Sequence, residues 1–294
     1  MPVRTELADA IVAATNAPGS GLAESALVIA RLEYPRLDSA RYIALLDRLG
    51  DGAQRAIAEQ TRTAGDPSTL GCIKAFNDYL FTSQKFAGNR QRYEDPRNSC
   101  LNEVLDRRTG IPITMSLVYM EIGRRAGLRI DGVNFPGHFL VRCPEIGGRG
   151  GAGLIVDPFH GGALLSEPDC RLLLQKHVGP KVAFSPSLLA PATRQQIVAR
   201  MLLNLKRLYV SMRSFPQARE VTEMLLALTP SALGELRDRG LLAYHLNDVS
   251  GALRDLQTYL KLSGMSESDR ETRQEYAQIW EHVKTLRRRA AALN

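Results

Sequence analysis

Apolar residues recur at helical spacing through the first hundred residues of the chain. Residues 22–32 keep this spacing, and Asp38 is placed to cap a second helix. Asp66-Pro67 predicts a further helix start, because a capping acid is followed by proline at the first helical position. Asn98 is expected to cap a short helix that follows it. The pattern therefore predicts a helical N-terminal part.

The middle of the chain carries one apolar helix and then short strands. Pro112 opens an apolar helix that ends at Gly127, and we expect it to be the central buried helix. Four β-rich runs follow, at about residues 129–135, 138–143, 153–157 and 162–165. Ser166 and Asp169 form a predicted capping box for the next helix. We interpret the glycine-rich segment 147–153 as a flexible hairpin loop, because it lacks the lysine of a phosphate-binding loop.

The last hundred residues are helical and contain a repeat. Residues 179–192 hold three prolines and little pattern, so we interpret them as a linker. Ala218 and Ala252 lie 34 residues apart, each early in the second helix of a predicted helix pair. A period of 34 is that of the tetratricopeptide repeat. A final helix is expected over about residues 267–293.

Composition and charge exclude several classes of protein. The net charge is +7, but the basic residues are scattered apart from Lys284 and residues 287–289, so we do not expect nucleic-acid binding. No apolar run reaches the roughly 20 residues of a membrane span. The four cysteines are widely spaced and no secretory signal is visible, which favours reduced thiols in the cytoplasm. No histidine pair has metal-ligand spacing, so the sequence predicts neither a metal nor a cofactor.

The strongest chemical signal is a histidine and an acid on neighbouring predicted strands. His138 begins one apolar run and Asp157 ends the next. Adjacent antiparallel strands bring such residues together, and an imidazole oriented by a carboxylate is part of a nucleophilic triad.

Several motifs together resemble a known family. They are 86–89, 98–105, 108–114, 132–140, 157–162 and 238–242. This set resembles the transglutaminase-like proteins of the bacterial SirB type, which carry a transglutaminase-like core followed by tetratricopeptide repeats. The resemblance implies an α+β fold with a papain-like core and a small antiparallel sheet. We therefore expect a helical N-terminal part over 1–95, the core over 96–178, the linker over 179–192 and helical repeats over 193–294.

The resemblance also implies a site. In the wider superfamily a cysteine begins the central helix, and histidine and aspartate come from adjacent strands. The histidine and aspartate correspond to His138 and Asp157, but the cysteine position falls at Pro112 or Ile113. Neither residue is a nucleophile, so a classical transglutaminase or cysteine protease is not expected.

Three interpretations stay open. In the first, the core has lost catalysis and kept a pocket that binds a ligand or partner. In the second, another residue supplies the nucleophile: Cys100, or Thr114 or Ser116 near the start of the central helix. In the third, His138 acts as a general base on water or on a substrate proton. For Cys100, Thr114 and Ser116, a structural role is the more frequent one for such positions.

Polar residues around the helix before Pro112 are candidate binding residues. Asn98, Asn102, Glu103 and Arg108 are expected to form a polar rim of the same cleft, or else a cap and a solvated face. Asn134, in the motif that leads to His138, joins this set.

The leading functional hypothesis is a pseudoenzyme that binds a protein or peptide through its repeats and the His138 cleft. The alternative is a hydrolase or acyl-transferase that acts on amide bonds with a relocated nucleophile. A third hypothesis is a regulator of gene expression that acts through protein contacts.

Overall fold

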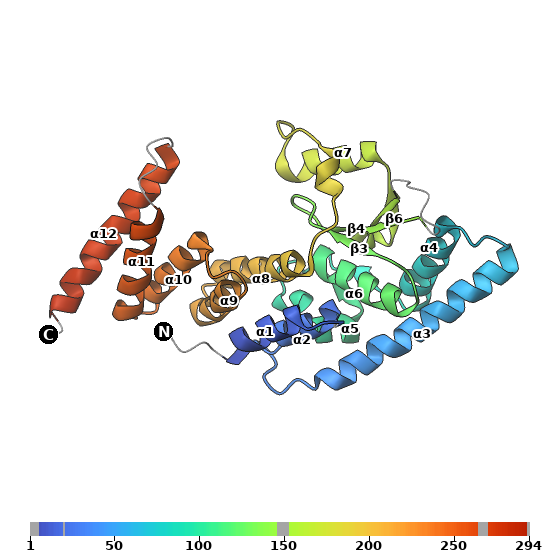
Figure 1. Ribbon diagram of the computed structural model, residues 1–294, viewed down its shortest axis with the longest axis horizontal. Coiled ribbons are helices and arrows are strands. Elements are labelled where there is room, and N and C mark those ends of the chain that lie inside the picture. Colours follow the sequence, from blue (N-terminus) through green and yellow to red (C-terminus); the bar gives the residue numbers. More distant parts are fainter. Residues whose placement is uncertain (1–5, 20, 146–152, 264–269, 293–294) are drawn as a thin grey trace. The chain divides into compact units, whose positions relative to one another are not determined.

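The computed structural model describes residues 6–19, 21–145, 153–263 and 270–292. These residues form two compact units (Figure 1). The core unit is Ala14–Met201, and the repeat unit comprises the described residues before and after it. The boundaries expected at residues 95 and 178 both fall inside the core unit. The hairpin loop expected over 147–153 lies, apart from Gly153, outside the described residues.

Helices make up most of the chain and are accompanied by a small antiparallel sheet, which confirms the predicted α+β fold. Those that begin before residue 190 are α1 (Glu6–Asn16), α2 (Leu22–Ala30), α3 (Ser39–Ala64), α4 (Thr69–Asn77), α5 (Leu101–Arg107), α6 (Pro112–Arg125) and α7 (Glu167–Val178). A π-helical turn over Asp78–Ser83 and 3₁₀ turns over Pro96–Ser99, Pro158–His160 and Pro186–Leu189 connect them.

Side-chain caps explain where the early helices start. Asp38 caps α3 as predicted, because its carboxylate accepts the Arg41 N–H at 3.3 Å. The start predicted at Asp66 is wrong by two residues. Ser68 is the cap of α4, and Asp66 instead accepts the Ser68 N–H at 2.9 Å and fixes the preceding turn.

Helix α6 is the buried centre of the core unit, as its apolar sequence predicted. Every residue from Pro112 to Gly123 is buried. The helix contacts α3 on one side and strand β4 on another (Figure 1). It ends before Gly127, whose φ of +85° provides the left-handed conformation that stops the helix.

A four-stranded antiparallel sheet follows α6. Its strands, in spatial order, are β3 (Asp131–Val133), β4 (Leu140–Cys143), β5 (Leu154–Asp157) and β6 (Ala163–Leu165). Two short parallel strands, β1 (Ala87–Gly88) and β2 (Thr109–Gly110), pair elsewhere in the core unit. Helix α7, which begins at the predicted capping box of Ser166 and Asp169, packs Cys170 and Leu174 onto the sheet.

The segment predicted as a linker is attached to the sheet. The Ala192 N–H donates to the Gly132 carbonyl at 2.7 Å. Phe184, Leu188 and Leu189 pack against the same apolar cluster as α7. Backbone and side chains of residues 179–192 therefore contribute to the core unit.

The repeat unit consists of helix pairs. Besides residues 6–13 of α1, it contains α8 (Arg194–Ser211, which begins in the core unit), α9 (Phe215–Leu228), α10 (Leu233–His245), α11 (Val249–Ser263) and α12 (Arg270–Ala292). Ala218 and Ala252, which defined the 34-residue period, are fully buried on α9 and α11. Helices α10, α11 and α12 share one apolar core that includes Leu256, Ile279 and Val283.

Candidate functional site

His138 and Asp157 meet because of the register between β4 and β5. Val141 pairs with Val156, so Leu140 comes opposite Asp157, and His138 lies two residues before Leu140. The His138 Nε2 atom lies 2.9 Å from Asp157 Oδ2. Both side chains are almost completely buried, with 3 % and 2 % of their surfaces exposed. The predicted histidine–acid pair is therefore present in the structure.

The Asp157 carboxylate is held by four hydrogen bonds. Its Oδ1 atom accepts the N–H groups of Phe159 at 3.1 Å and His160 at 3.3 Å. Its Oδ2 atom contacts both His138 and the Nδ1 of His160, the latter at 2.7 Å. Burial by itself would raise the pKa of Asp157, but the hydrogen bonds and charges of His138 and His160 outweigh it and hold that pKa below its ordinary value.

Two further histidines join this pair, and the sequence had assigned them no role. His160 reaches Asp157 because Pro158–His160 forms a 3₁₀ turn that Asp157 caps. The His177 ring, on α7, stacks on His138 with centroids 5.4 Å apart and planes 16° apart. We call His138, Asp157, His160 and His177 the histidine cluster. The local spacing Asp-Pro-x-His could have indicated His160, whereas no local signal indicates His177.

Aromatic and glycine contacts fix the rings of the cluster. The Phe159 ring meets His138 edge-on at a centroid distance of 6.0 Å. Gly137 adopts a φ of +71°, and a Cβ atom added there would lie 2.5 Å from the His177 Cβ. Burial, and then the charge of His138, lower the pKa of His177. The neutral form of His177 is therefore favoured beside its neighbours.

The three candidate nucleophiles are all buried, and each contacts a backbone group instead of His138. Cys100 is completely buried at the start of α5, its thiol points to the Pro96 carbonyl oxygen at 3.7 Å, and burial raises its pKa to about 12. Thr114 Oγ1 accepts the Ile111 N–H at 3.0 Å and is buried. Ser116 is buried and directs its hydroxyl to the Phe139 carbonyl oxygen at 3.4 Å. Among the described residues, no hydroxyl or thiol hydrogen-bonds to His138.

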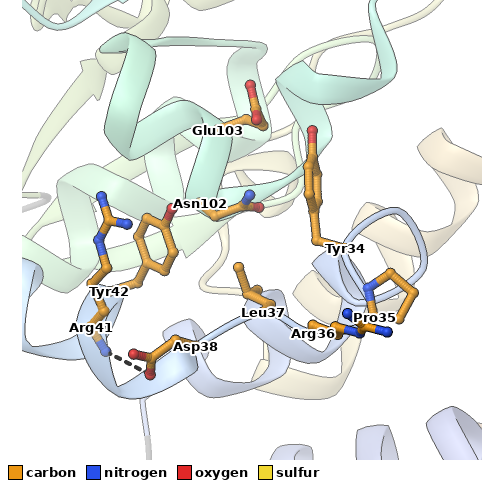
Figure 2. Close-up of a pocket in the computed structure, with 9 residues that line it drawn as sticks. All are labelled: Tyr34, Pro35, Arg36, Leu37, Asp38, Arg41, Tyr42, Asn102 and Glu103. Carbon is orange, nitrogen blue, oxygen red and sulfur yellow. Dashed lines mark hydrogen bonds between the residues drawn. The ribbon is translucent and has the colours of Figure 1, made fainter.

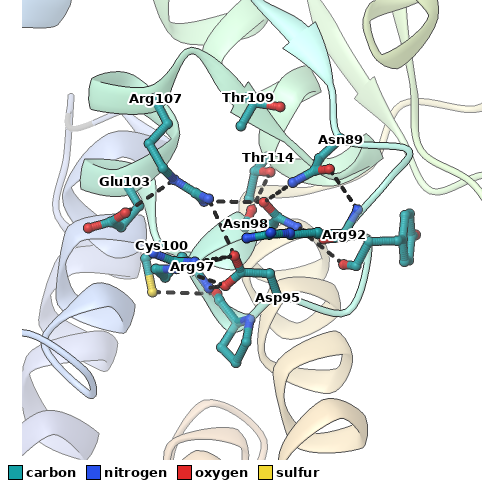
Figure 3. Close-up of polar contacts among 12 residues, drawn as sticks. Asn89, Arg92, Asp95, Arg97, Asn98, Cys100, Glu103, Arg107, Thr109 and Thr114 are labelled. Atoms are coloured by element: carbon teal, nitrogen blue, oxygen red, sulfur yellow. Dashed lines mark hydrogen bonds and ion pairs between the residues drawn. The ribbon is translucent and has the colours of Figure 1, made fainter.

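Asn98 is the centre of a buried polar network (Figure 3). Its Nδ2 donates to the Arg92 carbonyl at 2.6 Å, and its Oδ1 accepts from Asn89 at 3.0 Å and from Arg107 at 3.2 Å. The prediction that Asn98 caps the next helix is wrong. It lies within the 3₁₀ turn capped by Asp95, and Cys100 occupies the cap position of α5. Its amide faces inward, where it satisfies other polar groups.

Asn102 and Glu103 line a cavity of about 600 Å³ beside α5 (Figure 2). The other lining residues are Tyr34, Pro35, Arg36, Leu37, Asp38, Arg41 and Tyr42. Burial and the hydrogen bond to Glu103 raise the pKa of Tyr34 well above its ordinary value. Asn102 is only 3 % exposed, and its Oδ1 has no hydrogen-bond donor among the described residues. A buried acceptor without a donor is costly.

Arg108 and Asn134 lie in two other places. Arg108 ends α5 with a φ of +58°, and its guanidinium carbon lies 4.6 Å above the centre of the Phe86 ring. Burial lowers the pKa of Arg108. Asn134 follows β3, and its Oδ1 is buried without a partner among the described residues. Of the five candidate binding residues, Asn98 and Glu103 both contact Arg107, at 3.2 and 3.1 Å, and Asn102 and Glu103 line one cavity. Arg108 and Asn134 have other surroundings.

Three side chains of the cluster also form a potential metal-ligand set. The ligand atoms of His138, Asp157 and His160 all lie within 4.8 Å of one another. The sequence predicted no metal because it contains no histidine pair at ligand spacing. The fold supplies a grouping that linear spacing could not reveal.

Comparison with known proteins agrees with this architecture. Residues 40–203 match the transglutaminase-like superfamily, and residues 205–283 match the tetratricopeptide repeat. In the part of the chain that the structure describes, no helix is long and apolar enough to cross a membrane.

Relatives extend from bacteria to mammals. The UPF0162 protein of Xylella fastidiosa (strain Temecula1) is 39% identical over 82% of this chain and 83% of its own length. The UPF0162 protein of Pseudomonas aeruginosa is 30% identical over 82% of this chain and 84% of its own length. Human F-box only protein 21 is 34% identical over 59% of this chain, but over only 28% of its own length. The chain therefore belongs to the transglutaminase-like superfamily, with a tetratricopeptide repeat region after the core.

Proposed function

We propose that this protein is a transglutaminase-like protein without thiol catalysis, which binds a protein or peptide partner. The observation that carries the proposal is the start of α6. Pro112 and Ile113 stand where the superfamily resemblance places the nucleophilic cysteine. A thiol at a helix N-terminus gains reactivity from the helix dipole, and this helix begins with a residue that has no thiol.

The cysteines that the chain does contain are unsuited to replace it. All four are buried and unpaired. Burial raises the pKa of Cys100 and Cys143 to about 12 and that of Cys170 to about 11. Because the thiolate is the nucleophile, such thiols are unreactive near neutral pH.

The repeat unit supports the binding role. Stacked helix pairs of this type present extended surfaces for peptides. Trp280 on α12 and Met212 after α8 are large apolar side chains with 40 % and 52 % of their surfaces exposed. Exposed aromatic residues are frequent centres of binding energy in protein interfaces. We assign the main partner contact to this unit.

The core unit offers two further contacts for the same partner. His160 and His177 are exposed at the histidine cluster. The cavity beside α5, lined by Asn102 and Glu103, is the other candidate contact. We propose the histidine cluster as the second contact surface, and the cavity as a site for a side chain of the partner.

Peptide selection on the full-length protein tests the binding role. We expect displayed random peptides to yield binders whose affinity, measured by fluorescence anisotropy, falls at least about fivefold in Trp280→Ala because an exposed aromatic anchor is lost. Leu172→Ala is the matched control, since Leu172 is 65 % exposed on α7 of the core unit and should leave affinity unchanged. Equal losses in both variants, or no selected binder, would contradict the assignment to the repeats.

The alternative function is a hydrolase or acyl-transferase with a relocated nucleophile. The hydrogen bond of 2.9 Å between His138 and Asp157 favours it, because this pair orients an imidazole as a general base. Under this alternative, His138 would activate a substrate group or water, since no hydroxyl or thiol of the described residues is bonded to it.

Alkylation kinetics test whether a thiol of this chain serves as the relocated nucleophile. We expect all four thiols of the native protein to resist alkylation at pH 7, as mapped by mass spectrometry, and His138→Ala to change nothing. A thiol that reacts near neutral pH and loses this reactivity in His138→Ala would establish a cysteine–histidine pair and overturn the proposal. His282→Ala, in the repeat unit, controls for the loss of a histidine.

The family assignment can be refined further on the motifs. We infer that the chain is of the SirB type and acts in the cytoplasm, on the basis of the quoted motifs and its widely spaced, unpaired cysteines. A role in regulating gene expression would then proceed through protein contacts.

A further inference from the structure

The histidine cluster places three ligand types suited to a transition metal around one point. His138 contributes Nε2, His160 contributes Nδ1, and Asp157 contributes Oδ2. All three ligand atoms lie within 4.8 Å of one another. We propose that these residues form a binding site for a divalent transition-metal ion, and that the site prefers zinc.

The donor set fits this ion. Two imidazoles and one carboxylate are ligands of three-residue zinc sites, which keep a further position open. Hard ions such as calcium and magnesium prefer sites built from oxygen ligands, which two imidazoles do not provide.

The geometry needs only small adjustments. Ligand atoms on a tetrahedral zinc ion with bonds of about 2.0–2.1 Å stand about 3.3 Å apart. The two distances to Asp157 Oδ2 are 2.9 and 2.7 Å, so each must widen by a few tenths of an ångström. The distance between the two histidine nitrogens, which is at most 4.8 Å, must also approach about 3.3 Å. A turn of the His160 imidazole, whose side chain is 34 % exposed, about its side-chain torsions provides most of this change.

The surroundings hold the ligands in place. The two backbone N–H groups on Asp157 Oδ1 fix the carboxylate and leave Oδ2 directed at the histidines. His138 is confined between the stacked His177 ring and the edge of Phe159. Groups that orient ligands in this way contribute strongly to metal affinity.

The three proposed ligands differ in how far their side chains are exposed to solvent. The side chains of His138 and Asp157 are 3 % and 2 % exposed, whereas that of His160 is 34 % exposed. An ion would therefore reach the site from the His160 side. Water, or a group from a bound partner, would occupy the remaining coordination position there.

Zinc titration of the full-length protein after treatment with a chelator tests the site. Calorimetry should show one zinc ion bound per chain. His160→Ala and Asp157→Asn should each weaken binding by roughly tenfold or more, because the first removes a ligand and the second replaces an anionic carboxylate with a neutral amide. His282→Ala, a histidine of the repeat unit, is the matched control and should bind zinc like the wild type.

Cobalt bound in place of zinc should give the visible absorption of a four-coordinate ion, and this band should be lost in His160→Ala.

A variant can bind less zinc because it is less stable, and thermal unfolding with and without zinc distinguishes this case from the loss of a ligand. Zinc should raise the melting temperature of the wild type, since a ligand that binds the native state stabilises it, and should not raise that of Asp157→Asn. Wild-type affinity in His160→Ala, or no zinc binding by the wild type, would overturn the proposal. The metal site does not depend on the proposed partner binding, because zinc titration uses no partner and peptide selection can be run with and without zinc.

Discussion

Single residues at the histidine cluster serve several purposes at once. Asp157 caps a turn with one carboxylate oxygen and binds two histidines with the other. Gly137 has a similar double role, because it supplies a left-handed turn before His138 and leaves space for His177. A residue with both a conformational and a steric requirement is more sensitive to substitution than one with a single requirement.

Gly137→Ala should therefore destabilise the protein more than a comparable substitution nearby. The left-handed backbone costs any L-residue roughly 1–2 kcal/mol, and contact with His177 adds to it. Gly161→Ala isolates the first cost, since Gly161 has a φ of +70° but no atom within 4 Å of an added Cβ. Urea denaturation measures both free energies of unfolding. Equal decreases in the free energy of unfolding in the two variants would show that the contact with His177 does not contribute to the destabilisation.

At the scale of elements, the turn over Pro96–Ser99 organises the approach to α5 and α6. Asp95 caps this turn and pairs with Arg97 at 2.8 Å and with Arg107 at 3.4 Å (Figure 3). The hydrogen bond from Arg97, which outweighs the effect of burial, lowers the pKa of Asp95 below its ordinary 3.8. Since the folded-state pKa is depressed, the ionised carboxylate stabilises the fold above that ordinary value. This stabilisation is lost as the pH falls through the folded-state pKa.

Asp95→Asn should show this pH dependence directly. Asparagine can still cap the turn through Oδ1, but the substitution removes the charge and replaces Oδ2, which accepts from Arg97 and Arg107, with an amide nitrogen that cannot accept. Because one partner is half exposed, the expected loss at pH 7 is at most about 1 kcal/mol. The difference from the wild type should shrink as the pH is lowered below 3.8. Asp51→Asn, at an exposed position of α3, controls for the loss of one negative charge. A difference that stays constant with pH would contradict the linkage.

At the scale of the whole molecule, the main partner contact is assigned to the repeat unit, and the metal site and the secondary partner contacts are assigned to the core unit. The histidine cluster and the cavity beside α5 belong entirely to the core unit, whereas the helix pairs form the repeat unit. The core of the repeat unit is reinforced by Lys206, whose ammonium group pairs with Glu235 at 2.7 Å and with Asp238 at 2.6 Å. Variants in one unit can therefore be used as controls for the other, as the peptide and zinc experiments do.

The sequence by itself determined the features that depend on neighbours along the chain. Pro112 and a continuous apolar run predicted the buried α6, Ser166 and Asp169 predicted the start of α7, and the period of 34 predicted the helix pairs. These are local signals, since caps, prolines and periodic apolar positions act within a few residues. The pair of His138 and Asp157 was also predictable, because two successive strands have few ways to pair.

Only the tertiary structure decided what gathers around that pair. His177 comes from α7 and reaches His138 because α7 packs on the sheet and Gly137 allows close approach. Of the set expected to form one polar rim, Asn98 faces inward and satisfies buried groups, whereas Asn102 and Glu103 line a cavity, and Arg107 contacts both Asn98 and Glu103. Such contacts depend on packing between segments distant in sequence, and no local pattern encodes the direction in which a polar side chain is buried.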